Sequence, residues 1–167
     1  MKPIKIFLDP APSIGLEAIK HTLRTLADIA GLAIHFVSNP NESPFDLAYC
    51  RNLNQVSSRI FIPMSVKDTE CIFAPCKLTQ GKFDYDIVLT AFSLISGLHE
   101  AGMTKDSHDH HHIESSVLYQ KNILHIPLVN QYGAILREAF ASNNPLPMWP
   151  EGKTWAAAIT HDVDYPK

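Results

Sequence analysis

The sequence predicts an α/β fold with a small open, partly parallel sheet flanked by helices. Short β-prone runs at Ile4 to Leu8 and Ala33 to Val37 enclose a stretch in which apolar residues recur at helical spacing. Two further short runs, Asp46 to Cys50 and Arg59 to Ile62, follow. The order strand, helix, strand and then further strands favours a sheet layer with at least one parallel pair. At 167 residues the chain is long enough for one domain with a hydrophobic core.

The first helix is expected between the first two strands. Pro10 and Pro12 stop the preceding strand, Ser13 can cap the helix and Gly31 stands where it should end. The turn before the helix has one glycine and two prolines, so it lacks the closely spaced glycines that bring backbone amides to a phosphate. We therefore do not expect a dinucleotide site there. The apolar helix positions are Leu16, Ile19, Leu23, Leu26, Ala27 and Ala30.

Two more helices and one more strand are expected in the second half. Asp84 to Glu100 has a wide apolar face and should be largely buried, with Asp84 or Asp86 favouring its N-terminal end. Asn122 to Ile126 reads as a short strand closed by proline. A last helix is predicted from about Gln131 to Ala141, capped by Asn130.

Composition excludes several classes of function. The hydrophobic fraction is 46%, the charged fraction is 19% and the net charge is −3, which is typical of a globular domain. The sequence has no run of lysine and arginine, so nucleic acid is not an expected partner. Its first residues read as a strand, so we do not expect a signal peptide there, and no apolar stretch is long enough to span a bilayer. We therefore expect a cytoplasmic protein without membrane contact.

The cysteines indicate reduced thiols. Cys50, Cys71 and Cys76 match no zinc spacing, and we expect them to be mostly buried. A redox pair of Cys71 and Cys76 is the weaker alternative.

A histidine cluster, His108-Asp109-His110-His111-His112, lies in a polar stretch. His108 and His112 are four residues apart, and on a helix both rings would lie on one face, where they could bind a metal ion. No helical period supports such a helix, so a solvated, mobile loop is the preferred interpretation. The alternative is a metal site at His108 and His112, with a metal-sensing or storage function.

The end of the chain has the composition of a domain boundary. We predict an α/β domain at residues 1–144, a proline-rich linker at 145–152 and the start of another domain at 153–167. Trp155 to Ile159 reads as a buried strand. With the resemblance described in the next paragraphs, we expect it to be the first strand of a (β/α) barrel whose remainder is missing from the chain. Asp162 and Asp164 follow that strand, and two carboxylates one residue apart can hold a metal ion and a water.

Thr160-His161-Asp162-Val163-Asp164 resembles the first motif of the polysaccharide deacetylase (NodB-homology) superfamily. The region from Phe83 to Pro166 is similar to the accessory domain that precedes such a catalytic domain in some bacterial proteins. The residues that carry this second resemblance are Asp86-Ile87, Phe92, Leu94-Ile95-Ser96, Ser115-Ser116 and Pro127-Leu128-Val129. The arginine-containing loop of that group is absent here.

The resemblance implies a parent protein that is a hydrolase, removing N- or O-acetyl groups from carbohydrates on a distorted (β/α) barrel. It implies that Asp162 is the catalytic base and that Asp164 binds a divalent metal such as zinc. The superfamily completes its metal site with a downstream His-x-x-x-His, which this sequence does not contain after Asp164. This chain alone should therefore be inactive and need no cofactor.

Besides the metal-sensing or storage function of the His108 to His112 loop, two functional hypotheses remain open. In the first, the chain is the N-terminal accessory domain of a metal-dependent carbohydrate deacetylase, and its partners are an acetylated carbohydrate and a C-terminal catalytic barrel. In the second, it is a stand-alone α/β binding or interaction domain and the terminal acids are incidental. The apolar strand at Trp155 is expected to dock on its own domain, to pair with a second copy in a homodimer or to be disordered.

Overall fold

A computed structural model describes residues 2–10, 12, 14–52, 54, 56–67, 71–147, 149–153 and 156–157. Its sheet contains six strands in the order β2-β1-β3-β4-β6-β5, and neighbouring strands are parallel except for the antiparallel β5–β6 pair. The predicted class, a small open and partly parallel α/β sheet with helices, is confirmed. The strands are β1 (Ile4–Leu8), β2 (Ile34–Val37), β3 (Phe45–Cys50), β4 (Ser58–Pro63), β5 (Leu78–Thr79) and β6 (Lys82–Phe83).

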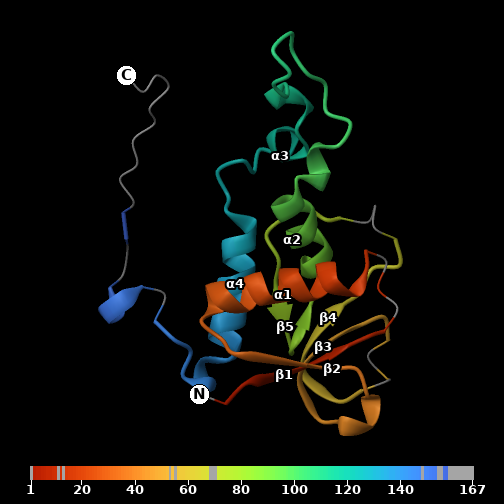
Figure 1. Cartoon of the computed structure of the whole chain (residues 1–167), viewed down its shortest axis with the longest axis vertical. Coiled ribbons are helices and arrows are strands. Elements are labelled where there is room, and N and C mark those ends of the chain that lie inside the picture. Colours follow the sequence, from red (N-terminus) through yellow and green to blue (C-terminus); the bar gives the residue numbers. More distant parts are fainter. Residues whose placement is uncertain are drawn as a thin grey trace, which may run out of the picture.

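The three longer helices lie on one side of the sheet (Figure 1). They are α1 (Leu16–Ala30), α2 (Ile87–Ser96) and α4 (Leu128–Ala139), and α1 packs against both of the others. A fourth helix, α3 (Val117–Gln120), is a single turn. The short 3₁₀ turns are η1 (Pro40–Glu42), η3 (Leu98–Glu100), η4 (Ile113–Ser115), η5 (Ala141–Asn143) and η6 (Pro150–Gly152).

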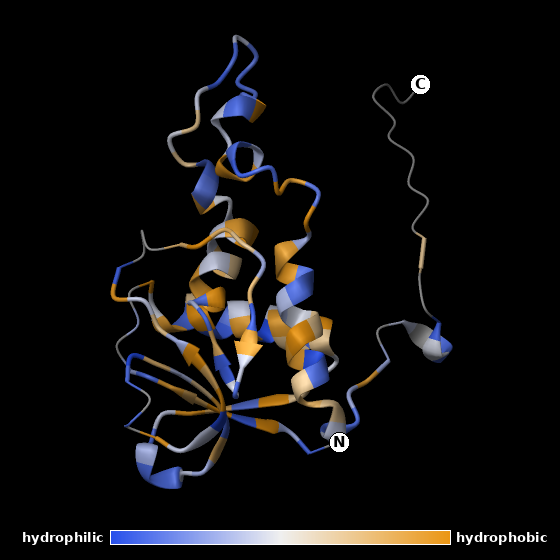
Figure 2. Cartoon of the chain, turned by 180° about the vertical axis from the view of Figure 1, so that it is seen from behind, coloured by the Kyte–Doolittle hydropathy of each residue, from blue (hydrophilic) through white to orange (hydrophobic). Residues whose placement is uncertain are grey.

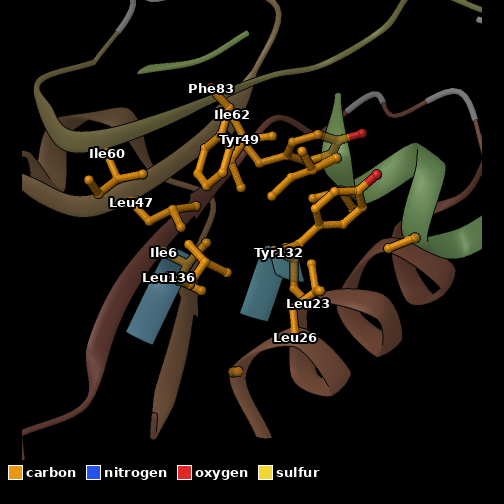
Figure 3. Close-up of a cluster of buried hydrophobic side chains, with 14 of the residues drawn as sticks. Ile6, Leu23, Leu26, Leu47, Tyr49, Ile60, Ile62, Phe83, Tyr132 and Leu136 are labelled. Carbon is orange, nitrogen blue, oxygen red and sulfur yellow. The ribbon is translucent and has the colours of Figure 1, made fainter. Parts of the chain in front are cut away.

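The main core lies between the sheet and these helices. Alternate residues of each strand point to the helical side, as the two-residue period of a strand requires. Figure 3 shows Leu23 and Leu26 of α1 and Tyr132 and Leu136 of α4 facing the strand residues. The strand residues of this cluster include Ile4, Ile6, Leu8, Leu47, Tyr49, Ile60, Ile62 and Phe83, all at most 4% exposed.

A smaller core lies on the opposite face of the sheet. Loops cover it: Val56 comes from the β3–β4 loop, and the Lys5 ammonium group donates a hydrogen bond to the Glu42 carbonyl of η1. The rings of Phe7 and Phe45 pack 5.1 Å apart there. The fold is therefore a sheet with helices on one face and loops on the other, among the described residues. The members of this second core are Phe7, Val37, Phe45, Ala48, Cys50, Val56 and Phe61.

Several predicted elements are confirmed and others are wrong. The first four strands and the first helix agree with the sequence pattern, and Gly31 ends α1 in the left-handed conformation. Ser13 lies outside the described residues, and the N-cap of α1 is Gly15, without a side-chain cap. The strand predicted at Asn122 to Ile126 does not form: Asn122 has a φ of 55° and ends α3 with a turn. The pair β5–β6 was not predicted, since each strand has two residues.

The second and third predicted helices have different limits. α2 is shorter than Asp84 to Glu100, because Gly97 takes a left-handed φ of 72° and stops it. Asp86 caps the first turn of α2, and it is one of the two residues, Asp84 and Asp86, that the sequence predicted for this end of the helix. α4 begins at Leu128, so Asn130 lies inside the helix and cannot cap it. Between them, residues 98–127 extend away from the sheet, and the tip of this extension is mostly hydrophilic (Figure 2).

Candidate binding sites at the edges of the sheet

The carboxyl edge of the sheet is organised by Asp86, which is 4% exposed. Its Oδ2 atom accepts hydrogen bonds from the Tyr49 hydroxyl at 3.0 Å and from the Ser65 main-chain N–H at 2.7 Å. Its Oδ1 atom accepts the Leu89 N–H at 2.8 Å, which is the N-cap bond of α2. One carboxyl group therefore joins the end of β3, the segment after β4 and the start of α2.

Burial is the main cause of the pKa shifts of Asp86 and Tyr49. It raises the pKa of Asp86 above the usual range of a carboxyl, and the hydrogen bonds from Ser65, Leu89 and Tyr49 oppose that rise. Burial also raises the pKa of the Tyr49 phenol far above its usual value, with the Asp86 charge adding to the effect. Tyr49 therefore stays a neutral donor. The bonds that Asp86 accepts are internal, which fits a structural role more closely than a role as a base.

An open cleft of about 610 Å³ lies beside this network. Its walls include Met64, Ser65, Cys71, Tyr85 and Asp86. Apart from the exposed Asp84 and the internally bonded Asp86, the lining is mainly apolar, so the cleft suits a small apolar group better than hydrolytic chemistry.

The thiols do not form the redox pair considered as an alternative. The three cysteines are free, and burial raises the pKa of Cys76 to about 12 and that of Cys50 to about 11. A thiol needs its thiolate form to react, so burial makes both of these groups poor nucleophiles. The expectation of reduced and mostly buried thiols agrees with this arrangement, although Cys71 is only partly buried.

The histidine cluster forms a tight loop rather than a helix. Asp106 organises it: Oδ1 accepts the N–H groups of His108 and His110, and the Asp106 N–H donates to the His110 carbonyl. Lys105 and His111 form an antiparallel bridge. The rings of His108 and His112 are thus not placed one above the other on a helix face. No group of three histidine, cysteine or acidic side chains that could hold a metal ion occurs in the described part of the chain.

His111 of this cluster and His99 lie on either side of Glu100. His99 Nε2 is 3.7 Å from Glu100 Oε1, and His111 Nδ1 is 3.5 Å from Glu100 Oε2. His99 is also held at its other nitrogen, where Nδ1–H donates to the Ser93 carbonyl at 3.0 Å. These contacts attach the loop to the end of α2.

The predicted catalytic residue Asp162 and metal ligand Asp164 lie outside the described residues, as does Trp155. The segment that leads toward them is fixed at its start. Leu146 donates its N–H to the Gly31 carbonyl at 2.8 Å, and the Arg137 guanidinium bonds both Ala30 O and Leu146 O. The chain therefore leaves the α/β domain at a defined point beside the end of α1.

Sequence reasoning missed the link between Tyr49, Ser65 and Asp86. A buried Asp before an apolar helix was visible as a helix N-terminal residue, but its partners are distant in the sequence: Ser65, in the segment after β4, is 21 residues away and Tyr49 of β3 is 37 residues away. A tyrosine at the end of a buried strand is the available signal, because a buried phenol needs a hydrogen-bond partner.

Fold and site together define an open α/β domain in which internal hydrogen bonds occupy the buried carboxyl group at the carboxyl edge of the sheet. The chain belongs to the Family of unknown function (DUF7033), which matches residues 16–145. No curated protein matches the sequence, and no solved structure does either. No helix among the described residues is both long and apolar enough to cross a membrane.

Proposed function

We propose that this chain is the N-terminal accessory domain of a metal-dependent carbohydrate deacetylase. One observation carries the proposal: the family match ends at residue 145, and the deacetylase-like motif at Thr160 follows a proline-rich segment just beyond it. The family domain and the motif are thus consecutive and do not overlap. The bonds of Gly31 and Arg137 to Leu146 support this arrangement, because they fix where the chain leaves the domain.

The chemistry that we assign to the parent protein uses the two acids of the motif. Asp162 would take the proton of the attacking water and Asp164 would bind a divalent cation. Carboxylate and imidazole donors suit zinc, which supplies polarisation of the acyl carbonyl and acidification of a water when it is bound. Acetylated carbohydrate would be the substrate, held by the catalytic barrel.

The coding sequence beyond the codon of Lys167 tests the proposal. An open frame continuing for about 200 residues, with a His-x-x-x-His after a strand, is the predicted result. Deacetylation of an acetylated oligosaccharide by the extended protein should then be lost in Asp162→Asn. A stop codon at that point, or deacetylation by the 167-residue chain alone, would contradict the proposal.

The second candidate is a stand-alone binding domain. It is favoured by the hydrophobic core between the sheet and the helices α1, α2 and α4. Most residues of this core lie within the part of the chain that the family matches. This candidate predicts that removing residues 165–167 leaves the melting temperature and any ligand binding unchanged. The accessory-domain proposal shares that expectation for stability, so only the coding sequence separates the two.

A further inference from the structure

A groove of about 550 Å³ opens at the amino edge of the sheet, where β1, β3 and β4 begin. Three cations line it: Lys2, Lys5 and Arg59. The acid in its lining is Asp46, whose Oδ2 atom accepts the main-chain N–H of Lys5 at 2.8 Å. The groove is therefore locally positive, on a chain whose formal net charge is −3.

Two of these cations are held in place by neutral groups. Lys5 donates to the Glu42 carbonyl and its ammonium lies 4.9 Å from the centre of the Phe45 ring. Arg59 donates to the Ala139 carbonyl at 2.6 Å and to the Ser142 hydroxyl at 3.3 Å. Within the described residues, none of the three cations makes an ion pair with a carboxylate. A carbonyl carries only a partial charge, so these contacts position the cations without neutralising them.

The ammonium group of Lys5 and the guanidinium group of Arg59 also have more N–H donors than their internal hydrogen bonds use. An ammonium has three N–H donors and a guanidinium has five, more than the contacts above use. The bonds to Glu42, Ala139 and Ser142 come from η1, α4 and η5, so both side chains are tied to other elements. A ligand would meet cations that have already lost much of their rotamer freedom, which lowers the entropic cost of binding.

An independent observation comes from Ser58, in the lining of the same groove. Its Oγ atom is buried and has no hydrogen-bond partner among the described residues. Buried hydroxyl groups almost always have a partner, because leaving one unpaired costs free energy. The hydroxyl is thus a donor without an internal use, in the wall of a groove that is lined by three cations and one acid.

We propose that this groove binds an oxyanion group, a carboxylate or a phosphate, with Lys2, Lys5 and Arg59 as its donors, joined by the Ser58 hydroxyl when rotation about the Cα–Cβ bond turns its buried Oγ atom into the groove. Charge-assisted hydrogen bonds from ammonium, guanidinium and hydroxyl groups suit such an anion. The anion could come from free phosphate or from the carboxylates of an acidic sugar polymer. The site belongs to the α/β domain and does not depend on the deacetylase proposal.

Calorimetric titration of the 167-residue chain at low salt tests the proposal, with inorganic phosphate in one arm and an oligogalacturonate in the other. Lys2→Gln should weaken binding by about fivefold, and Ser58→Ala should also weaken it. Ser58→Ala removes no internal hydrogen bond, so its melting temperature should stay close to that of the parent chain. Lys121→Gln, the matched loss of one exposed lysine in the α3 region, should leave binding unchanged.

The two arms identify the source of the anion. Binding of phosphate alone indicates a small free anion, and tighter binding of the oligogalacturonate indicates an acidic glycan. Absence of binding in both arms would overturn the proposal. Equal weakening by Lys2→Gln and Lys121→Gln would also overturn it, because it would show an effect of net charge and no defined groove.

Discussion

At the carboxyl edge of the sheet, the carboxyl group of Asp86 accepts hydrogen bonds from Tyr49, Ser65 and Leu89. At the amino edge, Lys5 and Arg59 have only neutral partners and the Ser58 hydroxyl has none among the described residues. Open α/β sheets commonly bind ligands at the carboxyl edge. In this domain the polar groups of Asp86 are used internally, and the unused donors lie at the opposite edge. The position of a site is thus set by which polar groups the fold leaves unpaired.

The largest expected effect is the loss of Asp86. Asp86→Ala leaves the Tyr49 hydroxyl and the N–H groups of Ser65 and Leu89 without their acceptor, so it should lower the free energy of unfolding by about 3 kcal/mol. Urea unfolding followed by circular dichroism measures this. Asp84→Ala is the control, because Asp84 is exposed and, among the described residues, its side chain accepts only the Lys77 N–H. Equal losses in both variants would contradict the structural role of Asp86.

The second largest loss of stability is expected at Gly31, where the chain leaves the domain beside Leu146. Gly31 has a φ of 69°, and an added Cβ atom would lie 2.4 Å from the Leu146 carbonyl oxygen. Gly31→Ala should therefore cost about 2 kcal/mol of unfolding free energy, from backbone strain and from displacement of Leu146.

Gly102→Ala separates those two causes. Gly102 has a φ of 89° and nothing within 4 Å of the added Cβ atom, so this variant carries the strain alone. Gly31→Ala should be the more destabilised of the two in thermal unfolding. If the variants were equally stable, Leu146 would not be held against the end of α1.

The pH dependence of stability checks the burial of Asp86. The pKa of Asp86 is higher in the folded state than in the unfolded state, where it lies in the usual carboxyl range near pH 4. At pH values between these two pKa values, the folded state therefore binds more protons than the unfolded state. The contribution of Asp86 is therefore fully present below about pH 4 and is lost as the pH rises through the folded pKa. Relative to Asp86→Asn, the parent chain should lose unfolding free energy across this window. A difference that grew with pH would contradict the direction of the pKa shift.

The smallest expected effect is on the rates at which the thiols of Cys50 and Cys76 react with a labelling reagent. The raised pKa values of Cys50, about 11, and Cys76, about 12, predict that both thiols of the folded chain react with a disulfide reagent at pH 8 at least about tenfold more slowly than in urea. Mass spectrometry of digested peptides assigns each rate. Labelling of Cys76 as fast as in the unfolded chain would show that this buried position opens readily.

Much of the fold follows from local patterns, while the sites depend on contacts between distant segments. The spacing of Leu16 to Ala30 and the apolar runs of β1 to β4 were sufficient to predict those elements. The strand expected at Asn122 failed because a short apolar run does not distinguish a strand from a turn packed on a helix. Asp86 and Ser58 could not be assigned, since hydrogen-bond satisfaction depends on which distant segments meet them. The predictions for Asp162 and Asp164 stay predictions, outside the described residues.

The difference between the two edges can be tested in a single titration. In a ¹H–¹⁵N correlation spectrum of the chain with increasing inorganic phosphate, the amide signals of Lys5, Ser58 and Arg59 should move together along one binding curve. The signals of Ser65 and Leu89, which are bonded to Asp86, should stay in place. Shifts centred on Ser65 and Leu89, with the amino edge unchanged, would contradict the account.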